Sequence, residues 1–130
     1  MNAVNNALLT LVRMPSRNDE DALLSEEEVL ITFVRSKNGK TRTIPVWFTL
    51  NSGKMELLPM YGLKTKWFVD LERSGRVGLG VKGWKKDAKP TFVRDPKTVD
   101  EIKERFSVKY GKGKVKKYYP TSEIALEIPL

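Results

Sequence analysis

The pattern of apolar and polar residues predicts a run of antiparallel strands in the first half of the chain. Residues 29–34 are mostly β-branched or aromatic and lead to Lys37-Asn38-Gly39, a strong hairpin signal. A second strand is therefore expected over residues 41–50. The turn Asn51-Ser52-Gly53 follows it and leads into a third strand over residues 54–59. Together these segments predict an antiparallel meander.

Helical periodicity predicts two helices in the second half of the chain. The first covers residues 64–74, and Gly75 ends it. The second covers residues 97–110, after the helix-starting pair Asp95-Pro96 and before Gly111. Strands are expected over 76–83, 88–94 and 123–128, with a turn over 84–87, whereas the basic, aromatic stretch 112–119 carries no predicted element.

The N-terminal region adds a helix and a turn to this pattern. Apolar residues recur at helical spacing over residues 2–13, and Ser25 with Glu28 in the capping-box position predicts a short helical turn. We therefore expect one domain over residues 1–130, with an N-terminal helix over 1–14. The barrel over 29–130 has six strands, mostly antiparallel, and peripheral helices. Pro45, which has no backbone N–H, belongs at a sheet edge or a bend of such a barrel.

Composition excludes several kinds of chemistry. The chain has no cysteine and no histidine, so disulfides, the usual zinc sites and catalysis by a thiol or an imidazole are ruled out. We expect no catalytic side chain and no metal ligand. No apolar run is long enough to span a bilayer and no leader is evident, which predicts a cytoplasmic protein. The lack of glutamine beside abundant Lys, Arg and Glu is typical of thermophile proteins.

Positive charge is concentrated in the second half of the chain. Residues 1–60 carry seven basic and seven acidic side chains, whereas residues 61–130 carry seventeen basic and nine acidic ones. The whole net charge of +8 therefore lies after residue 60. Such asymmetry indicates a phosphate-bearing partner, either a nucleic acid or a nucleotide-like cofactor. A well-solvated lysine-rich surface would give the same count.

Two segments carry groups suited to an anion. Arg42 and Thr43 offer a charged fork and a hydroxyl near the start of a predicted strand. Lys64, Thr65 and Lys66 precede the next helix, whose free N–H groups also favour an anion. Arg42 could instead be an edge charge that discourages association between sheets.

Three parts of the sequence form a family pattern: residues 40–48 (KTRTIPVWF), the turn 51–53, and residues 67–71 (WFVDL) followed by Arg76-Val77. This pattern resembles the split β-barrel flavin-binding family, which includes pyridoxamine phosphate oxidase-like proteins and deazaflavin-dependent nitroreductases. The resemblance covers residues 29–130 and implies a six-stranded antiparallel split β-barrel, mainly β with peripheral helices. It also implies a homodimer with FMN or a deazaflavin coenzyme of the F-420 type between the subunits. Such a protein passes hydride or electrons from the cofactor to a small organic acceptor.

The resemblance also assigns roles to residues. Three groups follow from it: the cofactor's anionic tail on Arg42, Thr43, Lys64, Thr65 and Lys66; its ring beside Pro45, Val46 and Trp47; and the substrate side at Tyr61, Tyr118 and Tyr119. Trp67 is a further cofactor-binding residue in this resemblance. Trp67 and the three tyrosines could equally be packing residues. Three dipeptides, Thr65-Lys66, Asp70-Leu71 and Ser74-Gly75, depart from the family pattern and leave the choice between FMN and a deazaflavin open.

Two other functions fit the composition. A small basic barrel could bind single-stranded nucleic acid by stacking and phosphate contacts, through Trp84, Lys85, Lys86, Tyr118 and Tyr119. A flavin carrier or sensor without turnover would share the cofactor-binding residues of the enzyme.

Overall fold

The computed structural model describes residues 23–121 and 123–130, so the helix expected over 2–13 lies outside the described residues. The described part contains eight strands and three complete α-helices. The strands are β1 (Glu28–Val34), β2 (Thr41–Trp47), β3 (Thr49–Asn51), β4 (Lys54–Leu57), β5 (Val77–Val81), β6 (Trp84–Ala88), β7 (Thr91–Val93) and β8 (Ala125–Pro129). The helices are the 3-10 helix η1 (Gly62–Lys64), α2 (Lys66–Ser74), α3 (Pro96–Tyr110) and α4 (Lys112–Tyr118).

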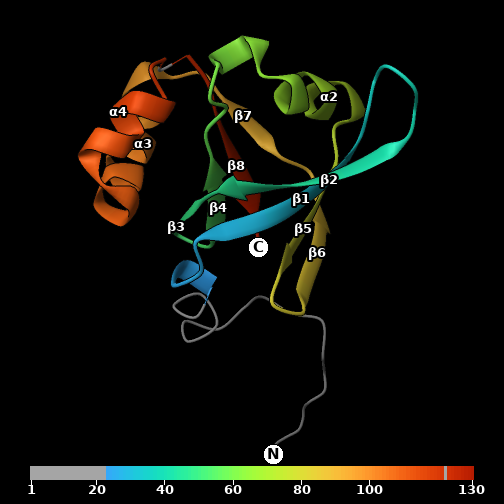
Figure 1. The fold of residues 1–130 in the computed structure, drawn as a ribbon, viewed down its shortest axis with the longest axis horizontal. Helices are drawn as coiled ribbons and strands as arrows, with labels where there is room; N and C mark the ends of the chain where they lie inside the picture. The colour runs from blue at the N-terminus through green and yellow to red at the C-terminus, as the bar shows by residue number, and fades with distance from the viewer. Residues whose placement is uncertain (1–22, 122) are drawn as a thin grey trace, which may run out of the picture.

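The strands form two four-stranded sheets, and every neighbouring pair is antiparallel. The first sheet has the order β2-β1-β5-β6, and the second has the order β3-β4-β8-β7. Helix α2 packs against the first sheet near β1, whereas α3 and α4 lie side by side next to the second sheet (Figure 1). The predicted mainly β, antiparallel fold with peripheral helices is confirmed, with eight strands in place of the predicted six.

The first hairpin forms as the sequence predicts. β1 pairs with β2 from Glu28 opposite Trp47 to Val34 opposite Thr41. Gly39 has a φ of 71°, a left-handed conformation that glycine adopts without strain, and the Asn38 side chain accepts a hydrogen bond from the Lys40 N–H at 3.0 Å.

The strand count differs because one predicted strand divides between the sheets and because β6 forms mainly from residues predicted as a turn. The segment predicted over 41–50 breaks at the fully buried Phe48, so that β2 joins the first sheet and β3 the second. The segment predicted over 88–94 breaks at Lys89-Pro90, where Pro90 cannot donate to a ladder. The chain thus changes sheets at these two points, and the apolar run around Phe48 gives no sign of the change.

Two turns were predicted in the wrong place. Residues 84–87 belong to β6, and the turn before it is Lys82-Gly83, where φ is 42° and 82°. Because β6 is the edge strand of its sheet, it tolerates the charged side chains that suggested a turn. Near the N-terminus, the helical residues precede Ser25 and Glu28 begins β1, so Ser25 does not cap a helical turn.

Helix α4 was not predicted from the sequence. Gly111 ends α3 with a φ of 104°, but the chain then forms a further helix that includes Gly113. Val115 and Tyr119 are buried four residues apart, which places both on the side of α4 that faces α3. Because lysines occupy four of the seven positions of α4, its helical pattern of apolar residues is not evident from the sequence.

Two apolar clusters form the interior. The first lies between the sheets and includes Ile31, Leu57 and Phe68, and the second lies between the second sheet and helices α3 and α4 and includes Ile102 and Phe106. Each fully buried side chain of this size contributes about 1.5–3 kcal/mol to stability. No helix in the described part of the chain is long and apolar enough to cross a membrane.

Candidate functional site

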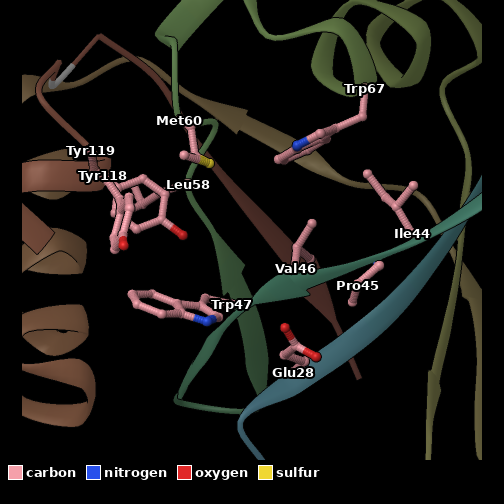
Figure 2. Close-up of a pocket in the computed structure, with 10 residues that line it drawn as sticks. All are labelled: Glu28, Ile44, Pro45, Val46, Trp47, Leu58, Met60, Trp67, Tyr118 and Tyr119. Carbon is pink, nitrogen blue, oxygen red and sulfur yellow. The ribbon is translucent and has the colours of Figure 1, made fainter. Parts of the chain in front are cut away.

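The candidate site is a pocket beside β2, the edge strand of the first sheet. We call it the aromatic pocket; it has a volume of about 370 Å³. Figure 2 shows its lining residues, which come from β1 and β2 of the first sheet, the segment after β4, α2 and the end of α4: Glu28, Ile44, Pro45, Val46, Trp47, Leu58, Met60, Trp67, Tyr118 and Tyr119. Glu28, Pro45 and Tyr118 are exposed, so the pocket opens to the surface.

The position of β2 explains how four successive residues line one pocket. Ile44 and Val46 stand opposite the buried residues Ile31 and Val29, so they point to the interior. Pro45 and Trp47 point to the other face. In the described part of the chain no strand pairs with the outer edge of β2, so these two residues also border the pocket. Pro45 lies on this edge strand, as predicted from its missing N–H.

Trp47 forms one wall of the pocket and is held by α3. Its indole stacks on the ring of Tyr110, with centroids 4.1 Å apart and planes 7° apart. Tyr118 stands edge-on to Trp47 at 5.8 Å and 88°. Tyr119 lies 6.1 Å from Trp47, and burial raises the pKa of its phenol far above the usual value. This wall is therefore a cluster of interlocked rings.

Tyr110 and Lys109 fasten α3 to the point where β2 passes into β3. The Tyr110 hydroxyl accepts a hydrogen bond from the Phe48 N–H at 2.9 Å, and it lies 2.7 Å from the Glu27 carbonyl, to which it donates. The Lys109 ammonium donates to the Phe48 carbonyl at 3.0 Å and lies 3.6 Å from the centroid of the Phe48 ring. Burial lowers the pKa of Lys109 to about 8, although the charges of Glu26 and Glu27 oppose this shift.

A buried ion pair anchors α3 to the second sheet. Glu56, on β4, is fully buried and receives two hydrogen bonds from Arg105, of 2.8 and 2.6 Å. The Thr49 hydroxyl donates a third, of 2.7 Å, to the same carboxylate. Hydrogen bonds to Glu56 raise the pKa of Arg105. The helix that supports Trp47 is therefore tied to the sheet by a bidentate contact.

Trp67, at the start of α2, forms the wall that faces Trp47 in Figure 2. It also packs against the first apolar cluster, so it has a structural role as well. The turn before α2 is tight: the Thr65 hydroxyl accepts a hydrogen bond from the Tyr61 N–H at 2.8 Å. Gly62 has a φ of 59°, and a Cβ there would overlap the Glu123 carboxylate. This packing determines where α2 begins.

The structure brings together six of the residues proposed from the sequence. Pro45, Val46, Trp47, Trp67, Tyr118 and Tyr119 line the aromatic pocket. The other six do not line it: Arg42, Thr43, Tyr61, Lys64, Thr65 and Lys66. Of these, Thr65 is buried and the remaining five are exposed.

Sequence reasoning missed four lining residues, Glu28, Ile44, Leu58 and Met60. Glu28 enters the site because β1 places it directly opposite Trp47. Leu58 and Met60 flank Pro59 just after β4, and only the pairing of the sheets brings them to β2. Ile44 could have been found, since it alternates with Val46 on a predicted strand.

A second hollow lies on the outer face of the first sheet. This outer groove has a volume of about 520 Å³ and is lined by Leu30, Thr32, Thr43, Gly78, Leu79, Gly80, Lys85, Lys86 and Asp87. Thr43 and Thr32 share a hydrogen bond of 2.8 Å across the strands.

The residues proposed for binding nucleic acid do not lie at one site. Lys85 and Lys86 line the outer groove, whereas Tyr118 and Tyr119 line the aromatic pocket. Trp84 packs against the first apolar cluster.

Metal chemistry finds no support in the described part of the chain. Among residues 23–121 and 123–130, no three Asp, Glu, His or Cys side chains lie close enough to hold a metal ion.

Comparison with known proteins identifies the fold. No protein-family model matches the sequence, and no curated protein is significantly similar to it. Solved structures do match, including an F420-H2 dependent reductase, FDR-A, at 15% identity and a TM-score of 0.62 over 79% of this chain and 94% of that one. The chain has the split-barrel fold.

Other structures with this fold are similar over more of the chain. The conserved hypothetical protein Rv2991 from Mycobacterium tuberculosis matches with a TM-score of 0.70 and 15% identity, over 90% of this chain and 81% of that one. HutZ, the heme storage protein from Vibrio cholerae, matches with a TM-score of 0.63 and 12% identity, over 91% and 90% of the two chains. Proteins with this split barrel therefore carry different ligands, and the ligand has to be argued from the site.

Proposed function

We propose that this split barrel is an oxidoreductase that holds the planar ring of FMN or a deazaflavin in the aromatic pocket. The observation that carries the proposal is that Pro45, Val46 and Trp47 on β2 and Trp67 on α2 line one pocket. The family resemblance suggests Pro45, Val46 and Trp47 for the ring and Trp67 as a further cofactor-binding residue, although Pro45 and Trp67 lie 22 positions apart in the chain. The ring system of an F420-H2 dependent reductase with the same fold makes this ligand class the first to test.

The pocket suits a flat, largely apolar ring. A volume of about 370 Å³ is at the small end of ligand sites, enough for a fused ring but not for a whole dinucleotide-sized molecule. Trp47 and Trp67 offer indole faces, and Leu58, Met60 and Val46 complete an apolar lining. A bound flavin or deazaflavin would supply hydride or electron transfer, and the protein would orient the ring and exclude water.

The anionic tail of the cofactor would leave the pocket toward basic residues at its border. Arg42 lies on the same side of β2 as Ile44 and Val46, about 6.6 Å along the strand from Ile44. Lys66 precedes Trp67 at the N-terminus of α2, where no side chain caps the free N–H groups. Thr43, Lys64 and Thr65 belong to the same two segments. We assign the tail to these segments because none of the described residues that line the pocket itself is basic.

The acceptor would enter from the open side, where Tyr118 and Tyr119 lie. Tyr61, 65% exposed, would reach it only from outside the pocket. A homodimer would cover this opening, since a shallow groove cannot enclose a planar cofactor by itself. One structure with this fold is described as a domain-swapped dimer. Sedimentation with cofactor at micromolar concentration tests the point, and a monomer alone would contradict it.

The deciding experiment is the absorption spectrum of the purified protein, before and after titration with FMN and with a deazaflavin coenzyme. We expect a bound flavin or deazaflavin band, and turnover with an added acceptor in the presence of a reductant. Binding without turnover for any acceptor would instead indicate a carrier or sensor. Neither band, together with salt-sensitive binding of an oligonucleotide, would favour the nucleic-acid alternative. A heme spectrum would overturn the proposal in favour of the ligand named for HutZ.

A further inference from the structure

The aromatic pocket carries an unpaired negative charge. Among the described residues that line it, Glu28 is the only charged one. Within residues 23–121 and 123–130, the neighbouring Glu26 forms an ion pair with Lys82 at 3.1 Å, but Glu28 forms none. A carboxylate at the border of an apolar hollow attracts a cation and repels an anion.

The aromatic rings next to this carboxylate also suit a cation. Glu28 stands directly opposite Trp47 in the β1–β2 ladder, so their Cβ atoms lie about 4.5–5.5 Å apart on one face. Tyr110 covers one side of the Trp47 indole, and Tyr118 stands at 88° to the ring. Trp47 is thus the ring next to Glu28, Tyr118 stands beside Trp47, and Trp67 lies across the pocket from Glu28 (Figure 2). Aromatic faces in such an arrangement bind ammonium groups through their quadrupoles.

We propose that the Glu28 end of the aromatic pocket binds a cationic group, and that the acceptor is a planar molecule carrying a protonated amine or a quaternary nitrogen. That the bound cation is the acceptor depends on the proposed function, whereas the cation site itself is inferred from the pocket alone. The chain has a net charge of +8, which attracts anions to the molecule as a whole. A preference for cations at this one place is therefore a specific signature of Glu28 and the rings.

The test uses three two-ring probes of similar size on the protein without added cofactor: N-methylquinolinium as the cation, 1-naphthalenemethanol as the neutral probe and 1-naphthoate as the anion. Calorimetric titration gives the affinities. Tryptophan fluorescence gives the location in a Trp84→Phe variant, because the two tryptophans that remain both line the pocket. We expect the cation to bind about tenfold more tightly than the anion.

Glu28→Gln should lower the ratio of cation to anion affinity by about fivefold, while circular dichroism shows an intact fold. The matched control is Glu27→Gln, which removes the same charge one residue away from a side chain that does not line the pocket. The control should keep the wild-type ratio. The cation site is overturned if 1-naphthoate binds as tightly as the cation, or if Glu28→Gln leaves the ratio unchanged. A protein that passes this test but shows no flavin or deazaflavin band keeps the cation site and loses the proposed oxidoreductase.

Discussion

The aromatic pocket and the outer groove both use β1 and β2, yet they are hollow for opposite reasons. The aromatic pocket is surrounded by large side chains from different elements that meet at their edges without filling the space. The outer groove exists because Gly78 and Gly80 have no side chains on that face of the sheet. Large side chains thus border the aromatic pocket, whereas the outer groove forms where two glycines lack side chains.

This difference predicts which hollow binds a planar ligand more tightly. Burying apolar surface stabilises a complex by about 25 cal/mol for each Å² removed from water, and the aromatic pocket offers rings for this purpose. Beside Leu30 and Leu79, the groove offers threonine hydroxyls, glycine backbone, two lysines and an aspartate, and such polar groups lose contact with water when a ligand covers them. The walls also differ in rigidity, since Tyr110 and Lys109 fasten the Trp47 wall to α3, and Arg105 ties α3 to Glu56 on β4.

The largest effect is expected when α3 loses its anchor. Arg105→Ala leaves the Glu56 charge buried without its partner, which should lower the free energy of unfolding by about 3–5 kcal/mol. The aromatic pocket should loosen with it, visible as a shift in tryptophan emission. Urea unfolding measures the loss, with Arg94→Ala as the control. Because the Arg94–Glu72 pair is exposed, its removal should cost at most about 1 kcal/mol. Equal losses in both variants would contradict the anchoring role.

A second substitution tests which hollow lies next to the cofactor's tail. Arg42→Ala should weaken binding of FMN or the deazaflavin by about 1.5–3 kcal/mol, or roughly ten- to a hundredfold, because a hydrogen bond to a charged group is lost. Arg42→Lys should recover only part of this, since an ammonium lacks the planar fork. The control Lys85→Ala removes a cation from the outer groove and should leave the affinity unchanged. The reverse pattern in a cofactor titration would move the tail to the groove.

Tyr110→Phe separates stacking from hydrogen bonding in the Trp47 wall. The variant keeps the ring on Trp47 but leaves the N–H of the buried Phe48 without its acceptor, so unfolding should become easier by about 1–2 kcal/mol. Thermal or urea unfolding measures it. Tyr118→Phe is the matched control, because no hydrogen bond of its hydroxyl occurs within the described residues. If both variants unfold alike, the Tyr110 hydroxyl does not hold this wall.

Lys109 should make stability depend on pH. Its pKa is about 8 in the folded protein, below the usual 10.5, because burial disfavours the charge. Between pH 8 and 10.5 the unfolded chain binds more protons at Lys109 than the folded protein does, so the free energy of unfolding rises with pH over this window. Below pH 8 Lys109 is charged in both states, and burying that charge lowers stability by its full amount. Urea unfolding at pH 7, 8, 9 and 10 should show this rise in the wild type and not in Lys109→Met. Parallel curves for the two proteins would contradict it.

The smallest effect is expected on the groove side. Gly80→Ala adds a Cβ that meets only the Trp84 carbonyl, at an ordinary contact distance of 4.0 Å. Stability should be unchanged or higher by up to about 1 kcal/mol, because the unfolded chain loses freedom. Binding of the cofactor or of the planar probes should not change. A loss of binding in this variant would show that the groove takes part in the site.

The first sheet was more predictable than the second. Its hairpin at Asn38-Gly39 depends on residues a few positions apart, and local turn chemistry determines it. The second sheet depends on chain crossings at Phe48 and at Lys89-Pro90, which are decided by where the chain finds a partner strand. A continuous apolar run such as the one around Phe48 is equally compatible with one long strand or two short ones.

The candidate site shows the same division. Pro45, Val46 and Trp47 are consecutive, so a strand with an unusual sequence was enough to single them out. Glu28 joins them through the register of β1, and Tyr110 through a stacking contact across 63 positions of the chain. Neither of these contacts can be predicted from the local pattern of apolar and polar residues. The charge of the pocket, which depends on Glu28, therefore became visible only with the fold.

The order of strands in the second sheet bears on how the protein is made. β8 is synthesised after the other seven strands of the described residues, yet it lies between β4 and β7 and pairs with both. A nascent chain can complete the first sheet once β6 has left the ribosome, but β4 must wait with its apolar residues Met55 and Leu57 uncovered. Pairing β4 with β8 closes the long loop between these strands, which is slow because the chain loses conformational entropy before the stabilising contacts form. β8 thus completes the second sheet late in folding on the ribosome, and a chain stalled before β8 would expose β4 to chaperones.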